Sequence, residues 1–246
     1  MNNYLIKIEY DGSNFVGWQR QKNGISVQGT IEKKIQKILK TKIKLIGSGR
    51  TDKGVHAKAQ FANFFSRKKI EEKKKFLNSI NFFLKKYHIS IIDLKKKKLD
   101  FNSRHSAKER IYVYKIVNRL GDLSLDYNRA WHIKSKLDIK LLRYGAKIFE
   151  GRHDFSTFRS ASCSANSPIK DMISVNVKKK EDEIFITFKS KSFLQNQVRS
   201  MVGSLKYLAE KKWDLEKFKK IFKAKKRHLC APPAPACGLY LKTVKY

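Results

Sequence analysis

The stretch GSGRTDKGVHA, residues 47–57, decides the organisation of this chain because it sets a single carboxylate among three glycines. Glycine admits positive φ and lets the backbone approach a ligand closely. Asp52 is the carboxylate, and Arg50 stands two residues before it. A carboxylate in a bent loop beside a cation can act as a nucleophile or as an acid or base. The same residue types also form plain surface turns, so the stretch alone leaves both readings open.

The segments on either side of this stretch predict strands. Residues Ile43–Ile46 are short and β-like, and Ala59–Phe65 (AQFANFF) is rich in β-formers. Asp52 is therefore expected in a connection between two strands, where rigid scaffolds commonly carry chemistry.

The first hundred residues predict a complete supersecondary unit. The apolar alternation of Tyr4–Tyr10 indicates a strand, and the helical spacing of Val27–Leu39 indicates a helix with Ser26 as its N-cap. A second helix is expected over Glu71–Lys85 and a strand over Ile89–Leu94. The resulting β-α-β-β-α-β order is that of the split βαβ, or ferredoxin-like, unit.

The second half predicts a similar order, without a detectable internal sequence repeat. Residues Asp100–Arg110 are polar and basic and are the expected crossing between halves, after which Ile111–Val117 forms a strand. Alternation along that strand puts Tyr112 and Tyr114 on one face. The remaining expected elements are strands at Ala130–Ile133, Met172–Val177, Glu183–Lys189 and Gly238–Val244, helices at Leu137–Phe149, Phe193–Leu208 and Trp213–Phe222, and a polar-aromatic loop at His153–Arg159.

The charge balance points to a polyanionic partner. The chain has 56 Lys and Arg against 21 Asp and Glu, a formal net charge of +35. Such a field attracts nucleic acid first, and also anionic membranes and heparin-like polymers. An AT-rich genome would enrich lysine, isoleucine and asparagine together, which explains part of the excess without any binding function.

Composition and hydropathy predict a globular, cytoplasmic protein. A hydrophobic fraction of 41% is too high for a disordered chain. Cys163, Cys230 and Cys237 cannot all pair within the chain and lack zinc-site spacing, so we expect reduced thiols. The first ten residues alternate as a strand rather than form a signal peptide, and no run approaches the ~20 apolar residues of a membrane span.

Four stretches together resemble the tRNA pseudouridine synthase A family, which isomerises uridine in the anticodon arm of tRNA. They are EYDGSNFVGWQRQ from Glu9, GSGRTDKGVHA from Gly47, FLQNQVRSMVGSL from Phe193 and APPAPACGLYL from Ala231. The resemblance covers nearly the whole chain, and GRTD followed by GVHA is its most specific part.

The resemblance implies a role for five residues. Asp52 matches the catalytic aspartate, and Arg50 matches an arginine that helps to hold the target base out of the stem. Tyr112 matches the tyrosine that stacks on the uracil, Arg199 the basic partner of the aspartate, and Leu239 an apolar wall of the pocket. The family needs no metal or organic cofactor and acts as a homodimer, with each tRNA spanning both subunits.

The positions of two histidines suggest a catalytic role, which the resemblance does not support. His56 lies four residues after Asp52, and we expect it to support the loop structurally. His153 and Asp154 resemble an acid/base pair, but we expect the stretch HDFSTFR to be a structural and RNA-facing loop.

The expected fold is α+β, the pseudouridine synthase fold, with two ferredoxin-like halves that share a mixed, mostly antiparallel sheet and a central RNA-binding cleft. Residues 1–104 form the half that carries the catalytic loop, and residues 105–246 complete the cleft. The expected reaction converts uridine to pseudouridine at positions 38 to 40 of tRNA, with an aspartate nucleophile and a flipped-out base. A non-catalytic RNA-binding protein is the alternative; a glycosidase-like hydrolase usually needs two carboxylates, and the glycine loop has one.

Overall fold

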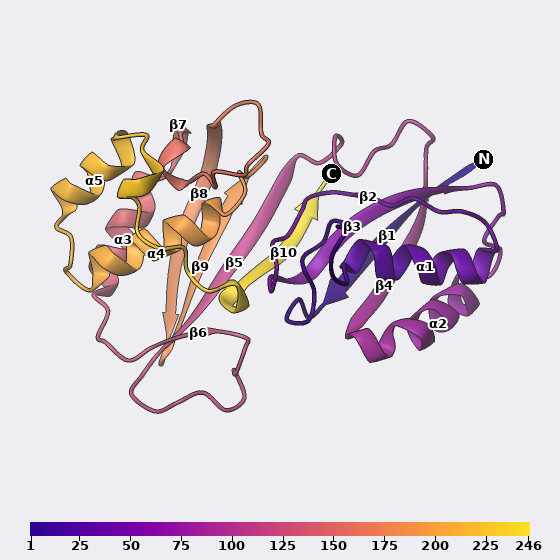
Figure 1. Cartoon of the computed structure of the whole chain (residues 1–246), viewed down its shortest axis with the longest axis horizontal. Coiled ribbons are helices and arrows are strands. Elements are labelled where there is room, and N and C mark those ends of the chain that lie inside the picture. The colour runs from indigo at the N-terminus through magenta and orange to yellow at the C-terminus, as the bar shows by residue number, and fades with distance from the viewer. The chain divides into compact units, whose positions relative to one another are not determined.

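The computed structural model describes all residues from 1 to 246, in two compact units. The first comprises residues 1–108 with 241–246, and the second comprises residues 109–240. Helices and strands are interspersed along the chain, and most strand pairs are antiparallel (Figure 1). The predicted α+β class with a mixed, mostly antiparallel arrangement of strands is confirmed.

The first unit has the predicted β-α-β-β-α-β order. Its elements are β1 (Asn2–Tyr10), α1 (Val27–Leu39), β2 (Ile46–Gly47), β3 (His56–Ser66), α2 (Lys73–Leu84) and β4 (Ile89–Lys97). Strand β1 lies between β4 and β3 and is antiparallel to both, and β2 pairs antiparallel with β3. Helices α1 and α2 lie side by side on this sheet (Figure 1).

Helix α1 begins and ends where the sequence predicts. The side chain of Ser26 accepts a hydrogen bond from the backbone N–H of Gly29 at 3.2 Å, which caps the first turn. The apolar stripe of Val27, Ile31 and Ile35 is fully buried. The amphipathic spacing therefore places the apolar face of the helix against the sheet.

The predicted strand at Ile43–Ile46 is wrong in extent, since β2 contains only Ile46 and Gly47. Side chains of α1 form hydrogen bonds with backbone groups that would otherwise pair with a neighbouring strand. The Glu32 carboxylate accepts from the Leu45 N–H at 2.8 Å, and Gln28 donates to the Leu45 carbonyl at 3.1 Å. Ile43 and Leu45 are buried although they are not in a strand, which explains the β-like pattern.

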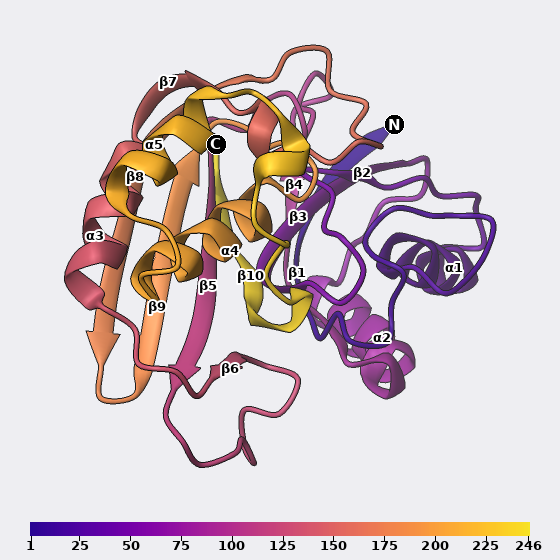
Figure 2. The ribbon, with the colours of Figure 1, turned by 60° about the vertical axis from the view of Figure 1, so that its left-hand side comes forward.

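The second unit builds its sheet from a hairpin of neighbouring strands and from strands more distant in sequence. Its elements are β5 (Glu109–Asn118), β6 (Trp131–Ile133), α3 (Ile139–Ile148), β7 (Gly151–Asp154), β8 (Ile169–Lys180), β9 (Glu183–Ser190), α4 (Gln197–Ala209) and α5 (Leu215–Lys223). The strand order is β5-β9-β8-β7, with β6 parallel on β5. Figure 2 shows α3 and α4 against this sheet. Strand β10 (Leu239–Lys245) begins in this unit and continues into the first.

The predicted loop at His153–Arg159 is partly wrong. His153 and Asp154 belong to β7, which pairs antiparallel with β8, and a 3-10 turn follows at Ser156–Phe158. The aromatic side chains of this stretch are core: Phe155 and Phe158 are buried and pack with Phe149 and Phe222. The partner strand lies about twenty residues further along the chain, so no local pattern could reveal the pairing.

Helix α4 begins four residues later than the predicted Phe193. Asn196 has φ of 60°, in the left-handed region, and therefore cannot continue a helix toward the N-terminus. The Gln197 side chain instead accepts from the Leu194 N–H at 2.8 Å and fixes the turn before the helix.

The three cysteines are free thiols, and none is bonded to another. No helix is both long and apolar enough to cross a membrane.

Candidate active site

Strand β3 fixes the beginning of the loop that carries Asp52. Ser48 donates its backbone N–H to the Phe61 carbonyl at 2.8 Å and its hydroxyl to the Gln60 side-chain oxygen at 2.6 Å. Gln60 also donates to the Gly49 carbonyl at 2.8 Å, and its side chain is fully buried. The Gln60 side-chain amide therefore forms hydrogen bonds with two consecutive residues, Ser48 and Gly49. These bonds restrict the backbone at the point where the loop begins.

The segment after β1 fixes the middle of the loop. Trp18 donates its N–H to the Thr51 carbonyl at 3.0 Å, and the Tyr10 and Thr51 hydroxyls lie 2.8 Å apart, both buried. Gly17 has φ of +118°, and a Cβ there would lie 2.7 Å from the Thr51 oxygen. Only glycine lets this segment press against the residue that precedes Asp52.

The turn at Asp11 and Gly12 fixes the end of the loop. The Gly12 N–H donates to Nδ1 of His56 at 3.1 Å, and Asp11 Oδ1 lies 3.2 Å from the same nitrogen. A Cβ on Gly12 would lie 2.0 Å from the Val55 oxygen, which excludes any larger residue without movement. His56 is buried, so its contacts agree with structural support of the loop.

Asp52 and Arg50 differ in exposure. Asp52 is half-buried, and its carbonyl accepts from the Val55 N–H at 3.2 Å in a tight turn. Gly54, with φ of +77°, completes that turn. Arg50 is exposed, and its Nε donates to the Gln19 side chain at 3.1 Å, which extends the guanidinium along the surface.

In the second unit, Tyr112 lies on β5, and its ring packs against the ring of Phe193. The ring of Phe193 meets it edge-on, with centroids 5.1 Å apart and planes at 81°. Tyr112 is 6% exposed. Tyr114, on the same face, is fully buried and donates its hydroxyl to the Pro235 carbonyl at 2.7 Å, and burial raises its pKa well above the usual value. Tyr114 is therefore structural, and it anchors the proline-rich segment.

Arg199 connects α4 to that proline-rich segment. Its Nε donates to the Ala234 carbonyl at 2.7 Å, its Nη1 donates to Asn196 Oδ1 at 3.1 Å, and its own carbonyl accepts from the Ala234 N–H at 2.9 Å. A Cβ on Gly203 would lie 2.1 Å from the Pro232 oxygen, so the segment lies directly against the helix. The chain then enters β10 at Leu239, which is buried.

The comparisons with known proteins agree with this arrangement. The model of a family described as tRNA pseudouridine synthase matches residues 6–105 and 146–246. The chain belongs to that family. It is 58% identical to the tRNA pseudouridine synthase A of Pelagibacter ubique (strain HTCC1062) over 246 residues, which is 100% of both chains. It is 41% identical to the enzymes of that name from Maricaulis maris (strain MCS10) and Parvibaculum lavamentivorans, over 100% of this chain and 98% and 100% of theirs.

One solved structure, the Cbf5-Nop10-Gar1 complex, aligns with 83% of this chain and 54% of its own chain, at 12% identity and a TM-score of 0.35. That likeness is too weak to carry an argument. The family match confirms the predicted class of enzyme: this pseudouridine synthase is an isomerase that acts on tRNA.

The predicted site residues of the synthase are distributed over its two units. Asp52 and Arg50 belong to the first unit, and Tyr112, Arg199 and Leu239 belong to the second. Within the second unit, the proline-rich segment links Arg199 to Leu239. The convergence of all five around one uridine stays a prediction.

Sequence reasoning missed the residues that hold the loop that carries Asp52. Gln60 is a polar residue within the apolar strand AQFANFF, a signal that could have marked it as a buried hydrogen-bonding group. The Tyr10–Thr51 contact joins residues 41 apart and has no local signal. No group of three or more His, Cys, Asp or Glu side chains is arranged to hold a metal ion.

Proposed function

We propose that this synthase forms pseudouridine at positions 38 to 40 in the anticodon stem-loop of tRNA, with Asp52 as the nucleophile. The fixation of the Asp52 loop supports the choice of nucleophile, and the relatives named tRNA pseudouridine synthase A support the substrate. Three separate segments hold the loop: β3 through Gln60, the segment at Trp18 and the turn at Gly12. A nucleophile gains most when its position is set before the substrate arrives, since bound geometry then lowers the entropic part of the barrier.

The reaction breaks the N1–C1′ bond, turns the uracil and joins C5 to C1′. The proposal leaves open whether Asp52 attacks C6, attacks C1′ or removes a proton from the sugar. In each case the target nucleotide must leave its stack, which costs a few kcal/mol, and the pocket must return that energy by stacking and hydrogen bonding. Exclusion of water would keep the detached uracil from being lost.

The other residues receive roles that suit their environment. Tyr112 would stack on the flipped uracil, and an aromatic face returns about 1–3 kcal/mol per base. Phe193 holds the Tyr112 ring edge-on, so the orientation of the ring is set in advance. Arg199, half-buried and held by Ala234 and Asn196, would pair with the Asp52 carboxylate and favour its charged form.

Arg50 and Leu239 would shape the rest of the pocket. Arg50 is exposed, as a group that helps to hold the target base out of the stem must be. Leu239 would supply an apolar wall. Residues 1–104 would present the catalytic loop and residues 105–246 the remaining walls. The enzyme would work in the cytoplasm as a homodimer, without a metal or organic cofactor.

Transcripts of one tRNA test the position of the reaction. Each transcript carries its only anticodon-arm uridine at position 38, 39 or 40, and a control carries it at none of them. Pseudouridine is mapped by carbodiimide modification and primer extension. Modification at these positions alone supports the proposal, whereas pseudouridine at another arm of the tRNA, with none at positions 38 to 40, refutes it.

A further inference from the structure

The loop between β5 and β6, residues 119–130, exposes large apolar side chains to solvent. Leu125 is 94% exposed, Leu120 is 79% exposed and Tyr127 is 70% exposed. Most other exposed apolar residues are dispersed over the chain, whereas these three lie within eight consecutive positions. Several exposed apolar side chains on one short segment of a folded protein indicate an interaction surface.

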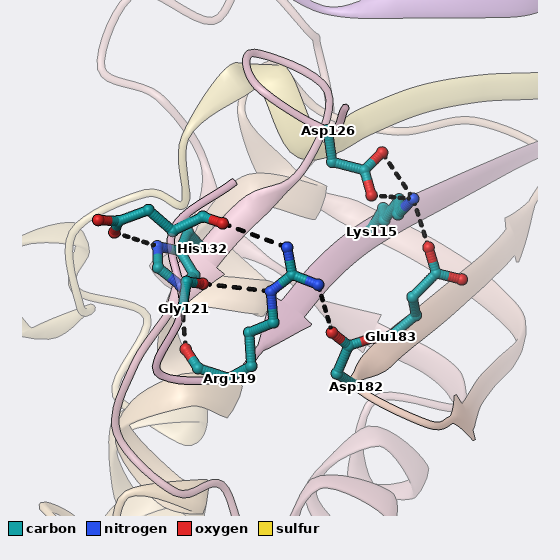
Figure 3. Close-up of polar contacts among 8 residues, drawn as sticks. Lys115, Arg119, Gly121, Asp126, His132, Asp182 and Glu183 are labelled. Carbon is teal, nitrogen blue, oxygen red and sulfur yellow. Dashed lines mark hydrogen bonds and ion pairs between the residues drawn. The ribbon is translucent and has the colours of Figure 1, made fainter. Parts of the chain in front are cut away.

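Ion pairs hold one end of this loop against the sheet. Lys115, on β5, lies 2.8 Å from both carboxylate oxygens of Asp126 in the loop and 2.6 Å from Glu183 on β9 (Figure 3). All three side chains are half-buried. These ion pairs therefore fix the loop at Asp126, whose neighbours in sequence are Leu125 and Tyr127.

Arg119 holds the other end of the loop. Its Nη1 lies 2.9 Å from Asp182, and its Nε and Nη2 donate to the Gly121 and Asp122 carbonyls, each at 3.2 Å (Figure 3). His132, on β6, contacts the Arg119 carbonyl at 3.0 Å. A surface that is ordered before binding loses little conformational entropy when a partner docks, so these contacts favour a docking role.

The charges around the loop cancel, in contrast to the rest of the chain. Residues 119–130 contain two carboxylates, Asp122 and Asp126, and two cations, Arg119 and Arg129, so this segment has no net charge, while the chain as a whole has +35. Ion pairs with Lys115, Lys134 and Asp182 neutralise Asp126, Asp122 and Arg119 locally. The carboxylates repel the phosphates of RNA, so we do not expect RNA to bind this loop.

The same charge balance decides which partner fits. Two copies of a chain with a net charge of +35 repel each other over most of their surfaces. They can approach only where the local charge vanishes and apolar area can be buried. Residues 119–130 meet both conditions.

We propose that residues 119–130 form the contact between two copies of the chain, with Leu120, Leu125 and Tyr127 packed across a two-fold axis. The inference rests on the homodimer in the proposed function and assigns its interface. In a two-fold contact the same patch serves both copies, so each substitution removes two side chains from the interface.

Sedimentation equilibrium of the full chain, without RNA, tests this interface. The wild type should be a dimer, and Leu125→Ser or Tyr127→Ser should raise its dissociation constant on the order of 100-fold, since each buried apolar side chain is lost twice. Tyr144→Ser is the matched control, because Tyr144 is 67% exposed on α3, outside the loop. It should leave the dimer intact. Far-UV circular dichroism spectra of the variants should match that of the wild type, because the replaced side chains are exposed within one chain and removing them should not unfold it.

Three outcomes would overturn the inference: a monomeric wild type, loop variants that dimerise like the wild type, or loop variants that keep their mass but bind tRNA more weakly. The third would assign the loop to RNA. Pseudouridine formation by the wild type is measured on the same sample. An active monomer would refute the interface and the homodimer but leave the proposed reaction standing, and an inactive dimer would refute the proposed reaction alone.

Discussion

Replacement of Tyr10 by Phe removes one hydroxyl from the contact that holds the residue before Asp52. The Tyr10 and Thr51 hydroxyls lie 2.8 Å apart, and the residues are 3% and 6% exposed. A neutral hydrogen bond of this kind contributes about 1 kcal/mol, and an unsatisfied buried partner raises the loss to about 2 kcal/mol. For a chain of this size, we expect the melting temperature to fall by about 2–8 °C.

The loosened loop should affect catalysis more than binding. Thr51 adjoins Asp52, and a misplacement of 1 Å can cost on the order of 100-fold in rate. We therefore expect kcat for pseudouridine formation to fall at least about 10-fold in Tyr10→Phe, with a small change in KM for tRNA. Thr51→Val should have a similar effect, and the double variant should lose less stability than the sum of the two by about 1 kcal/mol.

Tyr4→Phe is the matched control for this prediction. Tyr4 lies on the same strand, is 4% exposed and accepts a hydrogen bond from the Ile70 N–H at 2.8 Å. Tyr4→Phe should cost similar stability and leave kcat unchanged, because its contact does not involve the loop that carries Asp52. Equal falls in kcat for both variants, or additive losses in the Tyr10–Thr51 cycle, would refute the reasoning.

The remaining predictions concern packing, acid stability and RNA binding. Gly12→Ala places a Cβ 2.0 Å from the Val55 oxygen and should lower the free energy of unfolding by up to about 3 kcal/mol in urea melts, whereas Gly121→Ala, with no atom within 4 Å, should be neutral. Burial raises the pKa of Glu210, but hydrogen bonds from Ser135, Lys206 and Lys212 outweigh it and lower the pKa below 4.5. Its stabilisation is therefore present above pH 4.5 and lost as the pH falls through the folded-state pKa, so the stability advantage of wild type over Glu210→Gln should shrink in acid melts. The tRNA dissociation constant should rise steeply with salt in binding titrations, by about 0.7–0.9 in log–log slope per phosphate contact, and a flat profile would contradict an electrostatic interface.

Local signals predicted the first unit well. The N-cap residue Ser26 and the apolar stripe of α1 predicted both ends of the helix, because these signals lie in the helix or directly beside it in the sequence. The position of Asp52 between two strands also followed from its neighbours, since glycines interrupt two β-rich segments.

Two of the errors share one physical cause, which is that distant partners took the backbone hydrogen bonds. Glu32 and Gln28 bind the backbone of Leu45 and prevent a longer β2, although Leu45 looks like a strand residue. His153 and Asp154 form β7 only because β8 returns beside them. The residues that hold the Asp52 loop were missed for the same reason, since Tyr10 contacts Thr51 across 41 residues of sequence.

Release of tritium from tRNA labelled at C5 of uridine tests the central claim most directly, because formation of pseudouridine replaces the hydrogen at C5. Asp52→Asn keeps the size of the side chain in the half-buried loop and removes its charge, and a circular dichroism melt checks that the variant folds. The wild type should release label, and the Asp52→Asn enzyme should bind tRNA and release none above background. Release by the variant at the wild-type rate would contradict Asp52 as the nucleophile.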